Sequence, residues 1–410
     1  MSQASAMPAA LDYLLFDPAP YAFGPAALPI LPALHTDALR WHSGSAAPVP
    51  AWLGDGSQPP RLYSRARYAL QDAYRLSGVG PQGALLAPGY HCRTMLDPAL
   101  ALGAPVLLYA LHADLSLDLD DIARQLRGAV TPIKAVLASH FFGLAQDMGA
   151  LATLCRQHGA TLIEDCAHAL PLKRPFNRMG ATGTWCVSSP YKFFPCEDGG
   201  ALWSGTGQTA QLPPLRAATL RTELGQLRRM LAKARQPRLV VAGSPVVLHT
   251  PDAAQRLAQG VTARLRGPSV DFEPGQAALS CTAVSRWVIG HTDVAQLVER
   301  RRKHYQRWVA AVQPLHNARA LRPVLGEHDT PYMFPLLIDQ PDHHFAALKR
   351  AGLPIWRWDS LATSACPTAA RYRLTLLQLP CHQSLSDAAL AWMVGTLGQV
   401  LAAYPGQSPA

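Results

Sequence analysis

The sequence predicts an α/β fold in which a mostly parallel sheet is covered by helices on both faces and is followed by a smaller C-terminal α+β domain. Short apolar runs alternate with amphipathic helical patterns from about residue 67 onward. A chain of 410 residues, of which 49% are hydrophobic, has enough apolar surface for two cores. Beyond about residue 290 the alternation gives way to a long helix and then to mixed strands and helices.

The elements of the larger domain follow in order from these patterns. Apolar residues at helical spacing predict helices, while short β-branched and apolar runs predict strands. The expected helices cover residues 68–75, 93–102, 118–126 and 148–158, and the expected strands cover residues 84–87, 106–109, 133–138 and 161–164. Ligands bind at the carboxyl ends of parallel strands, which is where Ser139-His140 and Asp165 lie.

The two ends of the chain differ from this central part. Residues 1–58 are rich in alanine and proline and have weak periodicity, which predicts an arm and not a domain of its own. The C-terminal pattern predicts helices over residues 294–312, 344–351 and 387–402, with a strand over 333–338. The expected organisation is therefore an arm (1–58), a large α/β domain (59–289) and a small α+β domain (290–410).

Residues 212–267 interrupt the alternation of the large domain. They predict a basic amphipathic helix, in which helically spaced leucines lie beside basic residues: Leu220, Leu224, Leu227 and Leu231 with Arg221, Arg228, Arg229, Lys233 and Arg235. Such a helix packs on the body with its basic face in water, or it serves as a lid, a partner surface or a contact with an anionic surface. The sequence leaves these alternatives open.

Charge and cysteine content restrict the class of protein. A net charge of +10 and a pI of about 9.4 suit nucleic acid, anionic lipid or phosphorylated small molecules. The arginines are spread along the chain, and a run such as Arg300-Arg301-Arg302-Lys303 on a helical pattern predicts a solvated helix face. Eight cysteines without a CxxC pair, and no apolar stretch of about 20 residues, predict a cytoplasmic protein without a membrane span. We expect small-molecule partners and no nucleic acid.

Lys192 and Asp165 are the residue types that a pyridoxal phosphate site needs. Asp165 follows the apolar run 161–164, and Lys192 comes 27 positions later in Tyr191-Lys192-Phe193-Phe194-Pro195. A lysine amine forms a Schiff base with the cofactor aldehyde, and a carboxylate keeps the pyridine nitrogen protonated so that the ring can accept electrons. This pairing indicates an enzyme.

Four motifs extend this interpretation over residues 84–203. They are Ser139-His140-Phe141-Phe142-Gly143, then Ile163-Glu164-Asp165-Cys166-Ala167-His168-Ala169, then Pro190-Tyr191-Lys192, and finally Asp198-Gly199-Gly200-Ala201. Their types and order resemble the DegT/DnrJ/EryC1/StrS family of pyridoxal phosphate aminotransferases, which have the fold-type-I architecture. The resemblance implies the fold-type-I transferase fold, with pyridoxal 5'-phosphate as cofactor.

The resemblance also implies roles for single residues. Lys192 matches the Schiff-base lysine, Asp165 the partner of the pyridinium nitrogen, and His168 a neighbour of the ring oxygen. The family's members are dimers that build each site from two subunits, so a homodimer is implied. Their usual reaction moves an amino group from an amino acid donor to a nucleotide-linked keto sugar, and another biosynthetic ketone or aldehyde remains open for this chain.

The departures from the family pattern concern the cofactor's phosphate and ring. Arg65-Ala66-Arg67 replaces the usual Ser-Gly-Thr turn, so we expect Ala66 and Arg67 to hold the phosphate. Val187 replaces a serine, and the neighbouring Ser188 is expected to supply the hydroxyl. Cys92 occupies the position of the aromatic residue that stacks on the ring, so stacking is expected from His91 or Tyr90. The asparagine that the partner subunit usually contributes has no clear match around residues 271–285.

Two other functions remain open at this stage. One is a catalytically silent homologue that acts as a binding or regulatory module, with residues 212–267 contacting a partner. The presence of both Asp165 and Lys192 argues against it. The other is a pyridoxal phosphate-dependent lyase or dehydratase, because the same electron sink serves all these reactions. Related sugar dehydratases carry histidine in place of the lysine, so Lys192 favours amino transfer.

Overall fold

The computed structural model describes residues 10–16, 23–35, 39, 50, 60–173, 178–209, 211–235, 261–327 and 329–403. A sheet of seven strands organises the first half of the chain, in the order β2-β8-β7-β6-β5-β3-β4. The strands are β2 (Arg61–Tyr63), β3 (Ala84–Pro88), β4 (Val106–Tyr109), β5 (Ile133–Ser139), β6 (Thr161–Cys166), β7 (Trp185–Ser188) and β8 (Gly200–Trp203). Strands β3 to β7 pair in parallel, and β8 is antiparallel to both of its neighbours. The predicted mostly parallel sheet is confirmed.

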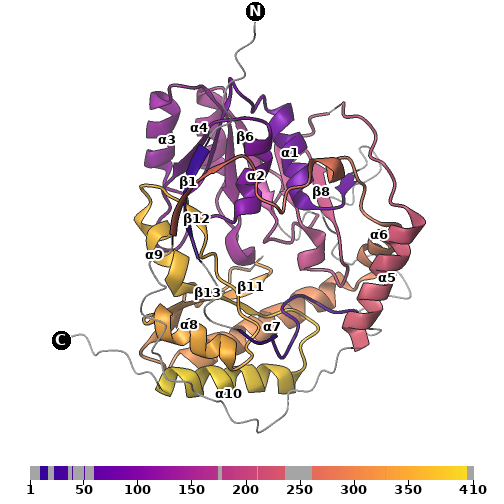
Figure 1. The fold of residues 1–410 in the computed structure, drawn as a ribbon, viewed down its shortest axis with the longest axis vertical. Helices are drawn as coiled ribbons and strands as arrows, with labels where there is room; N and C mark the ends of the chain where they lie inside the picture. The colour runs from indigo at the N-terminus through magenta and orange to yellow at the C-terminus, as the bar shows by residue number, and fades with distance from the viewer. Residues whose placement is uncertain are drawn as a thin grey trace, which may run out of the picture.

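Helices cover this sheet on both faces (Figure 1). They are α1 (Ala66–Leu76), α2 (Arg93–Ala101), α3 (Leu119–Gly128) and α4 (Gly149–Gln157), each within a few residues of its expected bounds. Side chains alternate along the strands, so that Leu85 packs with α1 and α2 while Leu86 packs with α3 and α4. The carboxyl ends of the parallel strands remain as the edge where a site can form.

A second sheet lies in the C-terminal half of the chain, in the lower part of Figure 1. It is antiparallel, in the order β10-β11-β13, with β10 (Ala318–Ala320), β11 (Met333–Ile338) and β13 (Leu376–Pro380). Its apolar cluster includes residues of α7 (Val294–Val312), α8 (Pro341–Arg350) and α10 (Asp387–Ala403). The helices α6 (Ala283–His291) and α9 (Pro367–Thr375) complete this half.

A third sheet joins segments that are far apart in the sequence. Strand β1 (Ala10–Leu15) pairs antiparallel with β9 (Val261–Arg266) and with β12 (Leu361–Ala362). The weak periodicity of residues 1–58 gave no sign of β1, because its partners lie hundreds of residues away. Residues 236–260 of the basic segment lie outside the described residues. No helix within the described ranges is both long and apolar enough to cross a membrane.

Candidate active site

One pocket at the carboxyl ends of the parallel strands contains both predicted reactive groups. Strand β6 ends with Asp165 and Cys166, and the short helix η5 (Pro190–Lys192) carries Lys192 just after β7. Asp165 and Lys192 line the same pocket, which has an empty volume of about 550 Å³ including its mouth. The first turns of α1 and α2, the end of β5 and Trp358 supply most of the remaining wall. An amine and a carboxylate from separate segments thus meet in one cavity.

Asp165 is held in a fixed orientation at the bottom of this pocket. Its side chain is 4% exposed, and its two oxygens accept hydrogen bonds from the Ala167 amide at 2.8 Å and the Ser139 hydroxyl at 3.2 Å. Burial raises the pKa of Asp165, while the Ala167 amide and the Lys192 amine oppose this shift. A cationic N–H donor beside this carboxylate would stabilise its charged form.

His168 lies in a box of aromatic side chains. Its ring centroid is 4.5 Å from that of Tyr332, 5.1 Å from that of Trp358 and 5.7 Å from that of Phe142. Burial, reinforced by the charge of Lys192, holds the pKa of His168 well below its usual value. The imidazole is therefore neutral, and its buried Nδ1 has no hydrogen-bond partner within the part of the chain that the structure describes. A neutral, partly unsatisfied imidazole can exchange a hydrogen bond with a ligand in the pocket.

Two helix N-termini supply the electropositive end of the pocket. Helix α1 begins after Arg65 and helix α2 after Cys92, and neither residue makes a side-chain capping bond to the described residues. Ala66, Arg67 and Thr94 from these first turns line the pocket, so main-chain N–H groups and the helix dipoles favour an anion there. The Arg65 guanidinium lies 4.9 Å from the centre of the Tyr191 ring. Arg67 donates a hydrogen bond to the main-chain oxygen of Asp271.

Comparison with known proteins agrees with this geometry. Residues 64–222 match the DegT/DnrJ/EryC1/StrS aminotransferase family. The similarity to this family extends over about two fifths of the chain. L-glutamine:scyllo-inosose aminotransferase of Streptomyces griseus is 31% identical over 193 residues, which are 46% of this chain and 41% of that protein. The pleiotropic regulatory protein of Geobacillus stearothermophilus is 29% identical over 154 residues, or 35% of this chain and 40% of that protein. The chain thus spans about two fifths of the length of these curated relatives.

The fold is shared over a longer part of the chain. The aminotransferase TlmJ from Streptoalloteichus hindustanus matches with a TM-score of 0.57 over 85% of this chain and 87% of that chain, at 22% identity. NtdA from Bacillus subtilis, whose structure contains the cofactor PMP, matches with a TM-score of 0.56 over 84% of this chain and 74% of that chain, at 14% identity. The expected fold-type-I aminotransferase fold is confirmed.

The structure places two residues expected for the DegT/DnrJ/EryC1/StrS site outside the pocket wall. Ser188 is the last residue of β7, is 1% exposed, and remains paired within the sheet opposite Cys166 and Ala201. The chain leaves the sheet only after it, so Ser189 lines the pocket instead. The hydroxyl group at the pocket wall therefore belongs to Ser189, one residue after the predicted Ser188.

His91 is the second such residue. It is fully buried, with Nδ1 bonded to the main-chain oxygens of Pro88 at 3.1 Å and Gly89 at 3.0 Å, while Nε2 accepts from the Ala362 amide at 3.3 Å. Burial lowers the pKa of His91 to about 4. Both ring nitrogens are used to tie the β3–α2 loop to β12, so ring stacking is not the role that this placement supports. Cys92 lines the pocket as expected, whereas Tyr90 is fully buried behind it.

Arg301 on α7 is a buried residue beside the site that the sequence did not predict. Its guanidinium is fully buried and donates to the Gln383 side-chain oxygen at 2.9 Å, to the main-chain oxygens of Pro331 and Tyr332, and to the Lys192 main-chain oxygen at 3.0 Å. Burial lowers its pKa to about 10. The expected solvated face at residues 300–303 is wrong for Arg301, because carbonyl groups from three remote segments surround it. Arg301 ties the lysine-bearing turn to the C-terminal half.

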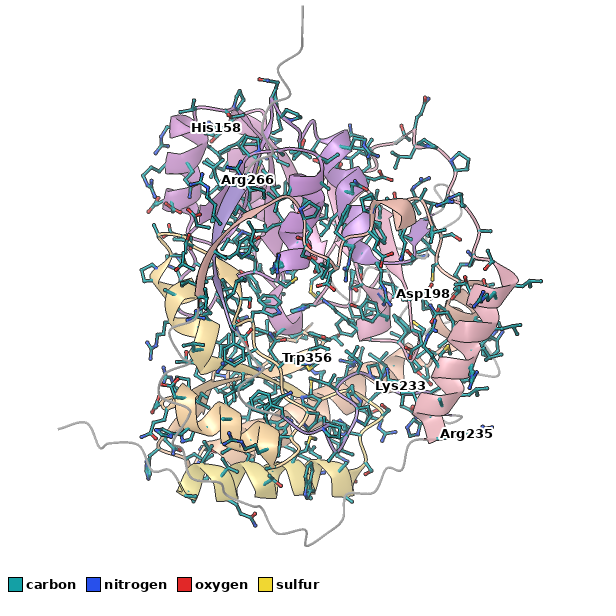
Figure 2. All side chains as sticks on the ribbon, viewed as in Figure 1. His158, Asp198, Lys233, Arg235, Arg266 and Trp356 are labelled. Atoms are coloured by element: carbon teal, nitrogen blue, oxygen red, sulfur yellow. The ribbon has the colours of Figure 1, made fainter. Side chains whose placement is uncertain are left out.

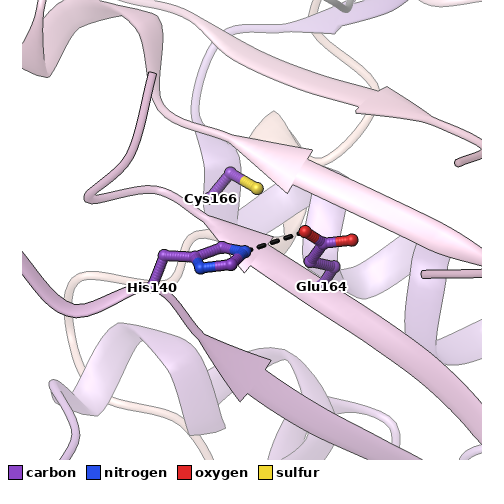
Figure 3. Close-up of side chains that lie close together, drawn as sticks. All are labelled: His140, Glu164 and Cys166. Carbon is purple, nitrogen blue, oxygen red and sulfur yellow. Dashed lines mark hydrogen bonds and ion pairs between the residues drawn. The ribbon is translucent and has the colours of Figure 1, made fainter. Parts of the chain in front are cut away.

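His140, Glu164 and Cys166 form a buried cluster (Figure 3), and His140 also lines the pocket. His140 Nδ1 accepts from the Gln146 amide at 2.9 Å, so Nε2 carries the hydrogen that is donated to Glu164 at 2.8 Å. Glu164 also accepts from the amides of Gly180 and Gly183. Although burial raises it, the bonds from His140 and these amides hold the pKa of Glu164 below its usual value. The donor atoms of His140 and Glu164 are engaged in supporting the ends of β5 and β6, which leaves them unsuited to a metal.

Proposed function

We propose that this protein is a pyridoxal phosphate-dependent aminotransferase that moves an amino group from an amino acid to a ketone or aldehyde of a small biosynthetic molecule. One observation carries the proposal: Lys192 and Asp165 line a pocket whose other end is formed by two helix N-termini with Arg65 and Arg67. Amine, carboxylate and anion site are the donor set that this cofactor requires. His168 Nδ1, which has no partner among the described residues, offers a further polar contact.

The proposed roles follow from where each group lies. Pyridoxal phosphate, when bound, supplies an electron sink for the carbanion formed at the substrate Cα. Lys192 Nζ would hold the cofactor aldehyde and would move a proton to and from the substrate Cα. The buried Asp165 carboxylate would keep a proton on the cofactor's ring nitrogen, and the neutral His168 would offer a polar contact to the ring. Arg65, Arg67 and the first-turn amides of Ala66 and its neighbours would bind the phosphate.

The walls of the pocket and the relatives support a substrate class. The name of the Streptomyces griseus relative specifies a cyclic polyol ketone, scyllo-inosose. A relative from Acidithiobacillus ferrooxidans, 31% identical over 144 residues (33% of this chain and 36% of that protein), is named for a nucleotide-linked dehydro sugar, UDP-N-acetyl-3-dehydro-alpha-D-glucosamine. In this chain, Trp358 and Phe141 offer apolar faces of the kind on which sugar rings stack. We infer a cyclic keto sugar or related polyol as acceptor, with glutamine or glutamate as donor.

The assembly and location are proposed on the same basis. We propose a cytoplasmic homodimer with an N-terminal arm (1–58), a large domain (59–289) and a small domain (290–410). The eight cysteines, which all lie within the described residues, are free thiols, as suits a reducing compartment. Sedimentation of the purified protein tests the dimer, and a strict monomer would contradict the shared site.

A spectrum tests the cofactor. Protein mixed with pyridoxal phosphate should gain a visible absorption band, and borohydride should fix the cofactor mass to the peptide that contains Lys192. Lys192→Ala should lose both signals, while Lys134→Ala, at an exposed lysine of β5, should keep them. A colourless protein that retains no cofactor would support the alternative of a silent binding or regulatory module, for which the name of the Geobacillus relative gives some support.

The reaction type is tested next, with the loaded protein. Glutamate or glutamine should discharge the visible band and release the corresponding keto acid in a single turnover. A band that persists with both donors, while a sugar substrate loses water, would instead support the dehydratase alternative. Release of ammonia without transfer to an acceptor would support a lyase.

A further inference from the structure

Helix α5 (Leu220–Arg235) exposes four leucines that the proposed reaction does not use. The exposed fraction is 81% for Leu220, 66% for Leu224, 38% for Leu227 and 40% for Leu231. Figure 1 shows α5 on the outer flank of the molecule, and Figure 2 shows Lys233 and Arg235 at its lower end. An exposed row of large apolar side chains is unfavourable in water and is typical of an interaction surface.

The helix is nevertheless firmly attached to the body. Gln226 and Met230 are buried, and the Glu223 carboxylate accepts hydrogen bonds from the Ala283 amide at 2.8 Å and the Val284 amide at 3.2 Å, at the start of α6. Lys233 pairs with Glu197 at 3.5 Å. These contacts define one side of α5, and the leucines lie on another side. The leucines therefore remain exposed even though α5 is packed against the rest of the protein.

The spacing of the leucines is that of a coiled-coil seam. Intervals of 4, 3 and 4 residues place them at alternating d and a positions of a heptad, within an arc of about 60° on the helix surface. Arg221, Arg228 and Arg235 follow at intervals of 7 residues and form the adjoining e column. All three arginines are exposed. We call these seven residues the leucine-arginine seam.

We propose that the leucine-arginine seam binds an amphipathic helix of another protein, one with an apolar a/d stripe and acidic flanks. The stripe is narrow and has no tryptophan or phenylalanine, whereas the apolar face that an interfacial helix buries in lipid commonly carries these residues. The arginine column requires acidic side chains opposite it, which a helical partner supplies from its e or g positions.

Pairing of α5 with a second copy of itself fits less well. In an antiparallel pair the e columns face each other, which would set arginine against arginine. In a parallel pair each e column faces the partner's g positions, which here are Glu223 and Met230. Glu223 is engaged with α6 and Met230 is 2% exposed, so neither is available. The charges on the seam thus select a different, acidic helix.

Two labelled peptides test the charge selection on the full-length protein. Both have about three heptads with leucine at a and d. One carries glutamate at e and g, and the other carries lysine there. Fluorescence anisotropy should show the glutamate peptide binding at least about tenfold more tightly than the lysine peptide, with the difference falling as salt rises. Equal binding of the two peptides, or binding of neither, would overturn the proposal.

Variants locate the binding on the seam. Leu224→Asp should abolish binding of the glutamate peptide, and the triple change Arg221→Glu, Arg228→Glu, Arg235→Glu should reverse the preference toward the lysine peptide. Arg229→Glu is the control for a single charge reversal on the helix, because Arg229 is exposed on the side opposite the leucines. It should bind the glutamate peptide within about twofold of the wild type. Circular dichroism checks that each variant is folded.

Two further measurements distinguish the other occupants. If Leu224→Asp converts a wild-type dimer to monomers in sedimentation, a second copy covers the seam and the proposal fails. It also fails if vesicles of phosphatidylglycerol and phosphatidylcholine bind the wild type and not Leu224→Asp. The cofactor spectrum should be unchanged in every seam variant, so failure here leaves the proposed aminotransferase function standing.

Discussion

Two helices of this protein carry runs of arginine, and the fold uses them in opposite ways. On α7, Arg301 is fully buried and donates to side-chain and main-chain oxygens that include the carbonyl of Lys192. On α5, Arg221 and Arg228 are exposed beside exposed leucines. The helical patterns are alike, so the difference arises from what lies opposite each helix. Irregular segments with unpaired carbonyl groups need donors, whereas the face of α5 meets water or a partner.

The largest effect is expected at the buried arginine. Arg301→Met would remove the guanidinium donor to the main-chain oxygens of Pro331, Tyr332 and Lys192, at a cost of about 3–5 kcal/mol in the free energy of unfolding. Urea denaturation of the apoprotein measures this loss. A loss below about 1 kcal/mol would mean that the buried Arg301 guanidinium contributes little to stability. Arg301 would then not differ in this respect from the exposed arginines of α5.

The conservative variant separates positioning of the lysine from general stability. Arg301→Lys retains a charge but has one donor group in place of the planar fork that reaches Lys192, Pro331 and Gln383. We expect a folded protein in which the absorbance change of the bound cofactor titrates at a different pH from the wild type. An unchanged titration in a stable Arg301→Lys protein would show that Arg301 serves stability alone.

Buried histidines extend the comparison to pH. His91 titrates near pH 6.5 when unfolded, but burial lowers its pKa to about 4 in the folded protein. Below pH 6.5 the unfolded chain therefore binds the proton first, and stability falls as the pH falls from 7 toward 4. His91→Gln should reduce the loss of stability between pH 7 and pH 5 by about 2 kcal/mol, measured by urea denaturation at both pH values. The exposed His158→Gln serves as the control; equal slopes for the wild type and His91→Gln would contradict the assignment.

Arg65 and Arg67, which line the pocket, are half-buried and thus lie between the buried Arg301 and the exposed arginines of α5. Arg65→Gln should weaken pyridoxal phosphate binding about tenfold, because a charged donor to the phosphate is lost. Pyridoxal, which lacks the phosphate, should bind both proteins alike. Arg67→Gln should have a smaller effect, since Arg67 is already engaged with the Asp271 carbonyl. Fluorescence titration gives both affinities, and an equal loss for pyridoxal would place Arg65 away from the phosphate.

These environments explain which features could be predicted from the sequence. Asp165 and Lys192 were predictable because parallel strands end at one edge, and the local patterns fixed most helices and strands. Arg301 was not, because its burial depends on carbonyl groups at residues 192, 331 and 332 that no helical pattern reveals. Strand β1 depends on pairing with β9 and β12, and His91 on two carbonyl groups of its own loop. Local sequence patterns thus predicted most helices and strands. Hydrogen bonds to other main-chain groups, which these patterns do not reveal, determined the placement of Arg301, β1 and His91.

The smallest effect is expected on α5 and completes the comparison with Arg301. Arg228→Met makes the same chemical change as Arg301→Met, but at an exposed position of a helix that is held to the body through Gln226, Met230 and Glu223. No buried acceptor among the described residues loses its donor, so the urea midpoint should not change measurably. Binding of the acidic peptide should weaken, because one of the three seam charges is gone. A urea midpoint that falls as far as that of Arg301→Met would show that the arginines of α5 stabilise the fold. That result would contradict the proposal that the leucine-arginine seam is a binding surface.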